Sequence, residues 1–422
     1  MPELPDRTLQ KDASLQLKSR RTQKTFAALK HPNYRLWFQG QIVSLFGTWM
    51  QTTAQGFLVY ELTHSPAYLG YIGFASGVPA WVLTLYGGVV ADRVPRRTLL
   101  IVTQTLMMIF AFILAAITFL HLVQPWHILV LSFLLGTANA FDAPARQAFV
   151  TEMVDKEDLT NAIALNATMF NSALAAGPAV AGITYAAFGP GWCFTINGLS
   201  FVAVIVALWM MKFEPMVARV NRGSVILELK EGLRHVINHQ VIRALFVVIA
   251  VNQFLVFSMS TLIPAWSVSI LRGDATTNGF LFSARGVGSL FGALAIASLG
   301  NFAFRGKLLT LGLFLSSIIL VAFALIRWMP LSLVVLVGLG VGTILIMNLA
   351  NAMIQTMTPE RLRGRVMGAY TWIFFGFMPL GALWTGWMAD RLGLSQTVIM
   401  NGALAFAAAS LVWYYFPRLR EQ

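Results

Sequence analysis

Charged residues are scarce in this chain of 422 residues: Asp, Glu, Lys and Arg make up 11% of it, whereas 57% of the residues are hydrophobic. In an ordinary soluble domain about a quarter of the residues are charged. The shortage of charge excludes a soluble domain, a coiled coil and a disordered chain. The apolar residues suffice for about a dozen membrane-spanning helices of about 20 residues each, so the composition predicts a polytopic membrane protein.

Cysteine, phosphate-binding motifs and metal-ligand clusters are also nearly or wholly lacking. Cys193 is the only cysteine, which excludes a disulfide within the chain. No G-x-x-x-x-G-K-[ST] loop occurs, and His235 and His239 form an H-x-x-x-H without a third patterned ligand. We expect no enzyme chemistry, no metal and no cofactor. The excess of 30 Lys and Arg over 17 Asp and Glu is explained by membrane topology, not by a nucleic-acid partner.

Breaks at charged residues, Pro and Gly divide the apolar sequence into twelve predicted spans. A bilayer admits only helices or closed barrels, and no strand alternation appears, so each span is predicted to be a helix. The spans are 38–60, 67–91, 98–120, 126–147, 160–187 and 191–212 in the first half, and 241–270, 276–300, 307–327, 330–356, 364–389 and 394–416 in the second. The predicted fold class is all-α integral membrane.

Lys and Arg are distributed unevenly between the two sides that these spans create. Twenty-six lie on the side of the N-terminus, three (Arg272, Arg327 and Arg391) lie in the opposite loops, and Arg285 lies within the eighth span. Because basic residues concentrate in cytoplasmic segments, we expect both termini in the cytoplasm, as tails of residues 1–37 and 417–422.

The longest inner loop, 213–240, separates two bundles of six spans, 38–212 and 241–416. Its stretch SVILELKEGLRHVI has apolar residues at helical spacing and charges opposite, which predicts an amphipathic helix on the inner leaflet. ADRVPRRTLL (91–100) after span two is echoed by GNFAFRGKLL (300–309) after span eight, pairing Asp92 with Asn301 and Arg96 with Arg305. In transporters, such parallel repeats place a site at the membrane midplane.

The loop between spans two and three reads Gly88-Val-Val-Ala-Asp92-Arg93-Val-Pro-Arg96-Arg97. Gly88 permits close contact between helices, and Asp92 with the arginines can form a charge latch that one conformation makes and another breaks. The stretch resembles the loop signature of the major facilitator superfamily, G-x-L-a-D-R-x-G-R-[RK], with proline and valine replacing its second Gly and its Leu. The alternative is an ordinary basic inner loop.

Span five contains Ala173-Leu-Ala-Ala-Gly177-Pro178-Ala-Val-Ala-Gly182. This resembles the antiporter signature G-x-x-x-G-P-x-x-x-G, with alanine for the opening glycine. A Gly-Pro pair in mid-span frees a backbone carbonyl and bends the helix, and small neighbours allow close packing. In the superfamily this signature accompanies proton-driven exporters, so the resemblance implies efflux. The alternative is a kinked packing helix without directional meaning.

Several further segments resemble one branch of the superfamily, which contains enterobactin-type siderophore exporters and macrolide efflux proteins. They are NYRLWFQGQIVSLFGTWMQ, LVYELTHSPAYLG, FDAPARQAFV, DLTNAIALN and CFTINGLSF in the first half and TPERLRGRVMGAY in the second. The resemblance implies the twelve-helix major facilitator fold, a small-molecule substrate, and a monomer in the bacterial cytoplasmic (inner) membrane. The sugar-porter signature is absent after span six, where the chain reads MKFEPMVARV, so a sugar importer is disfavoured.

Asp142 and Arg146 stand four residues apart at the inner end of span four. Ionisable groups inside a membrane are costly and usually paired. The family resemblance implies that Asp142 and Arg146 belong to the inner latch with Asp92 and Arg96. Alternatively, Asp142 carries the coupled proton, a role for which Glu61 is the second candidate.

Arg285 lies about nine residues, roughly 13 Å by helical rise, inside span eight. An arginine at this depth is too far from the surface to reach it easily and is a functional-site hypothesis by default. It either holds an anionic group of the substrate, balances a carboxylate such as Glu61, or ties backbone carbonyls together at a kink.

Polar residues on four spans form a candidate substrate cavity. They are Gln51 and Gln55 on span one, Asn139 on span four, Asn252 and Gln253 on span seven, and Asn348, Asn351 and Gln355 on one face of span ten. In the superfamily these four spans surround the central cavity. For each residue the alternative is a hydrogen bond between helices.

The sequence thus predicts a secondary active transporter that exports a small amphipathic or anionic molecule, drug-like or siderophore-like. Alternating access and inward proton flow would drive the export, with substrate, protons and the lipid bilayer as partners. One alternative is a lipid or lysolipid flippase on the same fold. Another is a non-transporting membrane scaffold or sensor, which the aligned polar faces disfavour.

Overall fold

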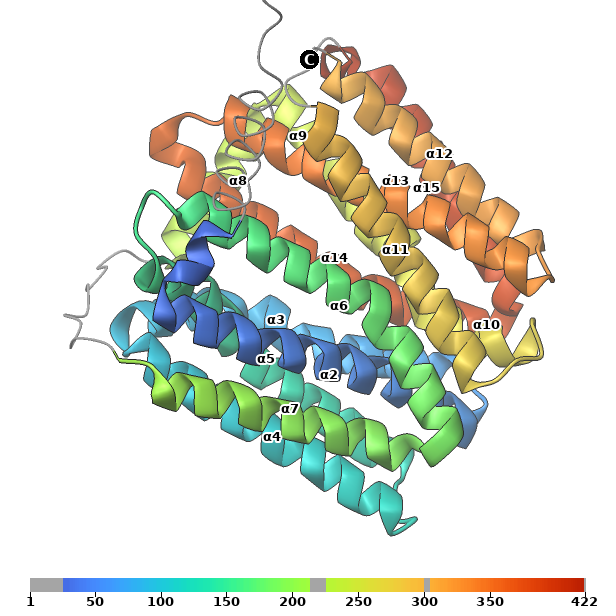
Figure 1. The fold of residues 1–422 in the computed structure, drawn as a ribbon. Coiled ribbons are helices and arrows are strands. Elements are labelled where there is room, and N and C mark those ends of the chain that lie inside the picture. Colours follow the sequence, from blue (N-terminus) through green and yellow to red (C-terminus); the bar gives the residue numbers. More distant parts are fainter. Residues whose placement is uncertain (1–25, 213–224, 300–303, 421–422) are drawn as a thin grey trace, which may run out of the picture.

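Helices make up all the regular secondary structure in the described part of the chain, which in this computed structural model is residues 26–212, 225–299 and 304–420. Figure 1 shows them as two groups joined through α8. The first group comprises η1 (Ala27–Lys30), α2 (Pro32–Thr63), α3 (Pro66–Arg93), α4 (Arg96–Phe119), α5 (Pro125–Met153), α6 (Leu159–Phe188) and α7 (Pro190–Met210). After α8 (Val225–Asn238), the second comprises α9 (Gln240–Val251), η2 (Asn252–Val256), η3 (Phe257–Leu262), α10 (Ile263–Ser269), α11 (Ala275–Leu299), α12 (Arg305–Leu325), α13 (Met329–Met357), α14 (Glu360–Leu392), α15 (Leu394–Tyr415) and η4 (Pro417–Leu419).

Local sequence explains where these helices begin and end. Proline stands in the first turn of α2, α3, α5 and α7, where its missing N–H has no partner to lose. Gly189 and Gly393 end α6 and α14 with φ of 87° and 88°. This backbone conformation suits glycine, and it allows α7 and α15 to begin at the next residue.

Nine helical segments in the described ranges are long and apolar enough to cross a membrane, or up to ten if the bent helix α3 counts as one span. Helices α2 and α6, of 32 and 30 residues, are long enough but carry polar residues along their length and are not among the nine. The membrane-protein class agrees with the sequence analysis. The count of twelve spans and the sidedness of the termini stay predictions.

Two pairs of helices join the groups: α3 packs on α14, and α6 packs on α11. Glycines permit both contacts. A Cβ added to Gly70 would lie 2.8 Å from the Ala382 carbonyl oxygen, and one added to Gly182 would lie 2.5 Å from the carbonyl oxygen of Ala275. Real side chains do not approach this closely, so the backbones touch where only glycine fits.

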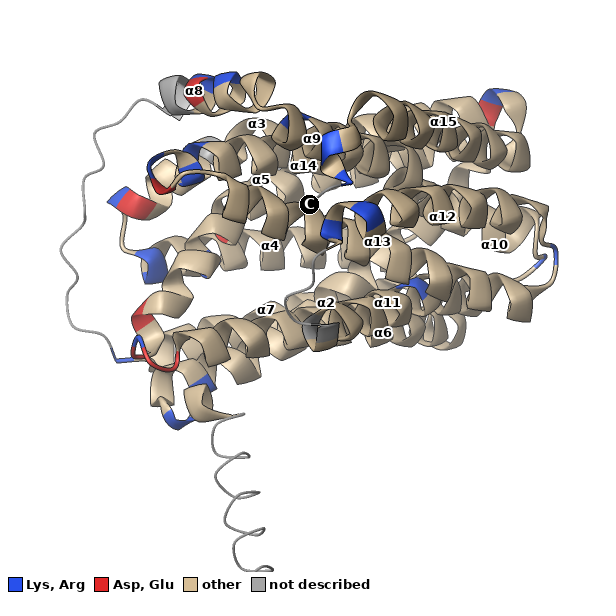
Figure 2. Ribbon diagram, turned by 90° about the horizontal axis from the view of Figure 1, so that it is seen from above, with Lys and Arg blue, Asp and Glu red and all other residues tan. Residues whose placement is uncertain are grey.

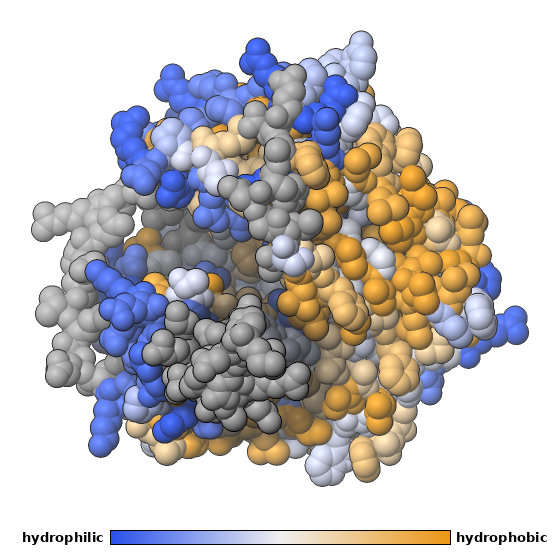
Figure 3. Space-filling model, turned by 45° about the horizontal axis from the view of Figure 1, so that its top comes forward, coloured by the Kyte–Doolittle hydropathy of each residue, from blue (hydrophilic) through white to orange (hydrophobic). Residues whose placement is uncertain are grey.

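These contacts extend from one end of the molecule to its middle, where Trp81 of α3 packs on Gly376 and Trp372 of α14. The glycines of α3 and α14 near the other end, Gly88, Gly364 and Gly368, have no atom within 4 Å of an added Cβ. By the predicted topology the packed end is the outer one and the separated end is cytoplasmic. Figure 3 turns the top of Figure 1 forward and shows hydrophilic residues gathered on that end, beside a hydrophobic flank.

Helix α8 packs on α14, and its expected place on the inner leaflet stays a prediction. Gly232 lies so close to α14 that an added Cβ would be 2.3 Å from the Arg365 carbonyl oxygen, and the Arg365 guanidinium pairs with Glu231 at 2.6 Å. Leu229 and Leu233 pack against the hydrophobic cluster of the second group. Part of its apolar face is therefore covered by protein, whereas Ile237 is 60% exposed. Residues 213–224 of this loop lie outside the described residues, as do residues 300–303 of the stretch that resembles 91–100.

Candidate functional site

Arg96 is the centre of the charge cluster at the turn between α3 and α4. Its guanidinium pairs with Glu152 at 2.5 Å and with Asp92 at 3.4 Å, and donates to the Ala148 carbonyl at 3.5 Å. The Glu152 side chain is 10% exposed and that of Asp92 is 45% exposed. Sequence reasoning missed Glu152, whose only signal is a carboxylate in the last turn of the helix that carries Asp142.

The other motif residues of this loop make fewer contacts. Arg97 donates to the Trp209 carbonyl at 3.1 Å, while Arg93 is exposed. The expectation that Gly88 permits close helix contact is wrong in this conformation, because the close approach occurs one residue earlier. An added Cβ on Gly87 would lie 2.3 Å from the Ala140 carbonyl oxygen of α5.

Asp142 has partners of its own. It is 1% exposed and accepts hydrogen bonds from Thr103 Oγ1 and Gln104 Nε2, both at 2.9 Å. Arg146 Nε lies 3.4 Å from its other oxygen. This network joins α5 to α4, and the structure does not bring Asp142 into contact with Asp92 or Arg96 as the family resemblance implied.

The antiporter-like segment lies where α6 meets both α2 and α11. An added Cβ on Gly177 would collide with a tryptophan of α2 at 2.8 Å. On the other side, the Pro178 carbonyl oxygen and Gly182 face Gly279 of α11, where an added Cβ would lie 2.4 Å from that oxygen. Pro178 and Gly182 thus take part in the α6–α11 contact between the two groups, whereas Gly177 allows α6 to pack on α2.

The predicted seventh span is irregular in its middle. It passes from α9 through one π-helical turn, η2, and a 3₁₀ stretch, η3, into α10. Pro264 near the start of α10 removes one N–H from the helix ladder. Irregular helical turns inside a span are tolerated where protein or water covers them, and π turns often occur at functional sites. Here the irregular segment packs mainly against α14, and one side chain of α11 reaches it.

Arg285 of α11 points at this irregular segment. Its side chain is 9% exposed, its guanidinium lies 4.2 Å from the Phe257 ring centroid, and it donates to Ser260 Oγ. Within the described residues no carboxylate comes within ion-pair distance of it. Glu61, the partner considered from sequence, is exposed and instead accepts a hydrogen bond of 2.5 Å from Tyr185. Arg285 is thus a buried cation whose counter-charge is not among the described side chains.

Gln51 and Gln55 do not face an open cavity. They are 4% and 7% exposed. Gln51 Oε1 accepts from Asn197 Nδ2 of α7 at 2.6 Å, and Gln55 Nε2 donates to Ser132 Oγ of α5 at 2.6 Å. The two amides therefore hold α2 to its neighbours within the first group. This matches the alternative to a cavity-lining role, a hydrogen bond between helices.

The remaining expected cavity residues divide into buried and open ones. Asn252 and Gln253 are fully buried beside α14, and Gln253 Nε2 donates to the Phe374 carbonyl at 3.5 Å. Asn139 is exposed although it stands in mid-span, and exposed Gln355 donates to Asn351 Oδ1 at 2.6 Å. Asn348, one turn further into α13, is half-buried. The structure does not gather the whole set into one site, but it leaves exposed amides on α5 and α13.

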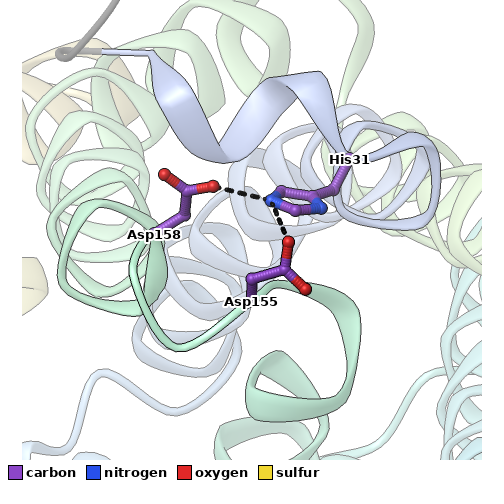
Figure 4. A group of neighbouring side chains, drawn as sticks. All are labelled: His31, Asp155 and Asp158. Atoms are coloured by element: carbon purple, nitrogen blue, oxygen red, sulfur yellow. Dashed lines mark hydrogen bonds and ion pairs between the residues drawn. The ribbon is translucent and has the colours of Figure 1, made fainter.

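Another charge cluster, not identified from the sequence, fixes the start of α2 (Figure 4). His31 Nε2 lies 2.8 Å from Asp158 Oδ2 and 4.0 Å from Asp155 Oδ2, and Lys30 Nζ lies 2.7 Å from the same Asp158 oxygen. The hydrogen bonds from Lys30 and His31 hold the pKa of Asp158 below its ordinary value of 3.8. Lys30 and His31 thus already bind the carboxylate that a metal ion would need, and the cluster ties α2 to the segment before α6.

Comparison with known proteins extends over almost the whole chain. Residues 23–422 match the family model described as transmembrane secretion effector. The multidrug efflux pump Tap of Mycolicibacterium fortuitum is 26% identical over 89% of this chain and 93% of its own length. The staphyloferrin A transporter of Staphylococcus aureus is 22% identical (91% and 96%), and macrolide efflux protein A of Streptococcus pyogenes is 23% identical (90% and 96%).

A solved structure has the same fold. A bacterial homologue of the human lysosomal transporter Spinster, in an inward-facing and unoccupied conformation, superposes with a TM-score of 0.72 over 93% of this chain and 99% of its own. The two sequences are 13% identical. The family expected from the sequence motifs is confirmed, and the all-helical, transporter-like fold agrees with the expectation. The family and these relatives are transporters, not enzymes.

Removing the carboxylate of Asp92 tests whether the cluster around Arg96 acts as a latch. Asp92 is partly exposed and weakly held in this conformation, so it is free to stabilise a closed inner end. We expect Asp92→Asn to reduce transport by up to about fivefold, by destabilising that closed state by about 0.2–1 kcal/mol as for a surface ion pair, with unchanged expression. Glu157→Gln, which removes an exposed carboxylate of the next loop, is the matched control. Normal transport by Asp92→Asn in vesicles would contradict the latch.

Proposed function

We propose that this chain, which belongs to the transmembrane secretion effector family, is an efflux transporter of the major facilitator type that exports a small amphipathic or anionic molecule. The names of the relatives, which include a multidrug efflux pump, a macrolide efflux protein and a staphyloferrin A transporter, support export of drug-like or siderophore-like compounds. The observation that carries the choice of substrate class is the buried, uncompensated Arg285.

Arg285 is suited to bind an anionic group of the substrate. A guanidinium is a planar fork of donors that matches a carboxylate or phosphate. Ser260 and Phe257 use one donor and one face of it, so other donors remain for a ligand. Phe257 also offers an apolar aromatic surface beside the charge, which fits an amphipathic molecule with an anionic group.

Alternating access is the proposed mode of movement. The two groups are the N-terminal bundle (38–212) and the C-terminal bundle (241–416). Their contacts at one end, and the absence of neighbours around Gly88, Gly364 and Gly368 at the other, support a conformation open to the cytoplasm. Exposed Asn139 and Gln355 would then face the water-filled opening. Closing the inner end would require the bundles to rock about the α3–α14 and α6–α11 contacts.

Inward proton flow is the proposed energy source. One charge moving down a potential of 100 mV supplies about 2.3 kcal/mol, which suffices for a roughly fifty-fold gradient. Two carboxylates are candidates for the proton carrier. Asp142 is buried within the first bundle, nearer its predicted inner end, and Glu61 is exposed at the predicted outer end.

The proposed membrane arrangement follows the distribution of basic residues. Twelve spans, cytoplasmic termini and a monomer in the bacterial inner membrane complete the proposal. A lipid or lysolipid flippase is the second candidate, because Arg285 would equally meet the phosphate of a headgroup. The exporter and the flippase differ in the size of the apolar part of the molecule that must be moved together with its anionic group.

Arg285 variants test the proposed substrate class. Arg285→Lys should keep part of the transport and raise the apparent KM, because a point charge replaces a fork. Arg285→Ala should abolish transport of an anionic compound and spare a neutral one, with an unchanged melting temperature. Arg327→Ala removes another arginine that lies near an aromatic ring, Trp266, and should affect both compounds equally or not at all.

A structural tie would behave differently. Arg285→Ala would then lower the melting temperature and reduce transport of both compounds alike. A stable Arg285→Ala protein that transports both compounds normally would contradict the anion site altogether.

Energy coupling is tested in cells and vesicles separately. A protonophore should collapse extrusion of the compound, whereas depletion of ATP with an imposed pH gradient should leave it intact. Extrusion that follows ATP, and persists after the proton gradient is gone, would refute the proposed coupling.

A further inference from the structure

A groove of about 420 Å³ lies on the second bundle, between α9 and α15. Its lining is Arg243, Val247, Ala408, Leu411, Val412, Tyr415 and Phe416. Small-molecule sites span about 300–1,000 Å³. No helix of the first bundle packs on α15 among the substantial contacts of the described residues, so the groove is separate from the interface between the bundles and opens on the flank that lipid would cover.

The groove has one cation, at its predicted cytoplasmic end. Arg243 is exposed, lies 5.5 Å from the Phe416 ring centroid and donates to the Ile237 carbonyl at 3.3 Å. No described carboxylate is within ion-pair distance of it. The rest of the lining is apolar apart from the Tyr415 hydroxyl. From Phe416 to Ala408 the groove runs eight residues along α15, about 12 Å by helical rise, away from the charge and into the predicted hydrocarbon region.

Basic residues predominate around Arg243. They are Arg305 and Lys307 at the start of α12, Arg418 in η4 and Arg420 just after it, and α9, α12, α15 and η4 contain no Asp or Glu. Helix α8, which packs on α9, carries Glu231, but this carboxylate pairs with Arg365. Figure 2 shows the blue segments beside α9 and near the C-terminus. Basic residues alone are expected on the cytoplasmic side. Their concentration on this side does not explain why an apolar groove begins at Arg243.

We propose that this groove binds one anionic phospholipid of the inner leaflet, with the phosphate on Arg243 and an acyl chain along Val247, Leu411 and Ala408. The cation at the headgroup level supplies charge complementarity, and the apolar lining below it matches the hydrocarbon chain. Basic pockets between helices at the cytoplasmic side are suited to anionic headgroups. The site rests on the proposed sidedness but on neither the exported substrate nor the coupling ion.

Native mass spectrometry of the purified full-length protein tests the site. The protein is incubated with phosphatidylglycerol or with phosphatidylcholine of the same acyl chains, and bound lipid is counted. Wild type should retain phosphatidylglycerol in preference. Arg243→Gln should weaken phosphatidylglycerol binding about fivefold, the effect of one basic residue, and Ala408→Trp, which fills the groove without changing charge, should weaken both lipids.

Arg361→Gln is the matched control, since Arg361 is an exposed basic residue at the same predicted side, on α14. It should leave lipid retention unchanged. Equal losses in Arg243→Gln and Arg361→Gln would show diffuse surface charge and overturn the site. No preference for phosphatidylglycerol in wild type, or full retention by Ala408→Trp, would overturn it as well. Because the readout is bound lipid, failure here is distinguishable from failure of the proposed export.

Discussion

Close packing of backbones between the two bundles is the constraint on which the rest of the structure depends. Small residues on α3 and α6 allow α14 and α11 to approach within distances that any added Cβ would violate. In a bilayer, helix association relies on such contacts, because lipid is as apolar as the side chains. Since the contacts are concentrated towards one end, they leave the other end apart, and in the proposed alternating access they would be the axis about which the bundles turn.

Two sets of charged side chains lie at different places relative to these contacts between the bundles. Arg285 lies on α11 within the segment packed on α6, next to Gly286, and its side chain faces the irregular stretch of span seven instead of lipid. Phe257 and Ser260 cover it on one side, which reduces the cost of a buried cation without neutralising it. The charge cluster around Arg96 lies at the separated end, where its exposure changes if the bundles close. The structure thus has a buried charge at the interface and a partly solvated one at the predicted cytoplasmic surface.

Local patterns in the sequence predicted the helices, the position of Arg285 and the family, because hydropathy, charge spacing and motif residues are local properties. What the sequence could not supply was which faces meet. Successive residues on a helix differ by about 100° in direction, so Gly87 touches α5 whereas Gly88 touches nothing. For the same reason, Gln51 and Gln55 turned out to bind Asn197 and Ser132 within their own bundle, and Glu152, from a distant part of the chain, became the nearest partner of Arg96.

Distances between spin labels across both ends of the molecule test the rocking movement most directly. One pair at Val94 and Arg363 spans the separated end, and another at Leu62 and Leu392 spans the packed end; all four residues are exposed. In lipid nanodiscs, across a pH series and with added substrate, we expect the first distance to shorten in the same population in which the second lengthens. Two distances that stay constant under every condition, or that change in the same direction, would contradict alternating access about the α3–α14 and α6–α11 contacts.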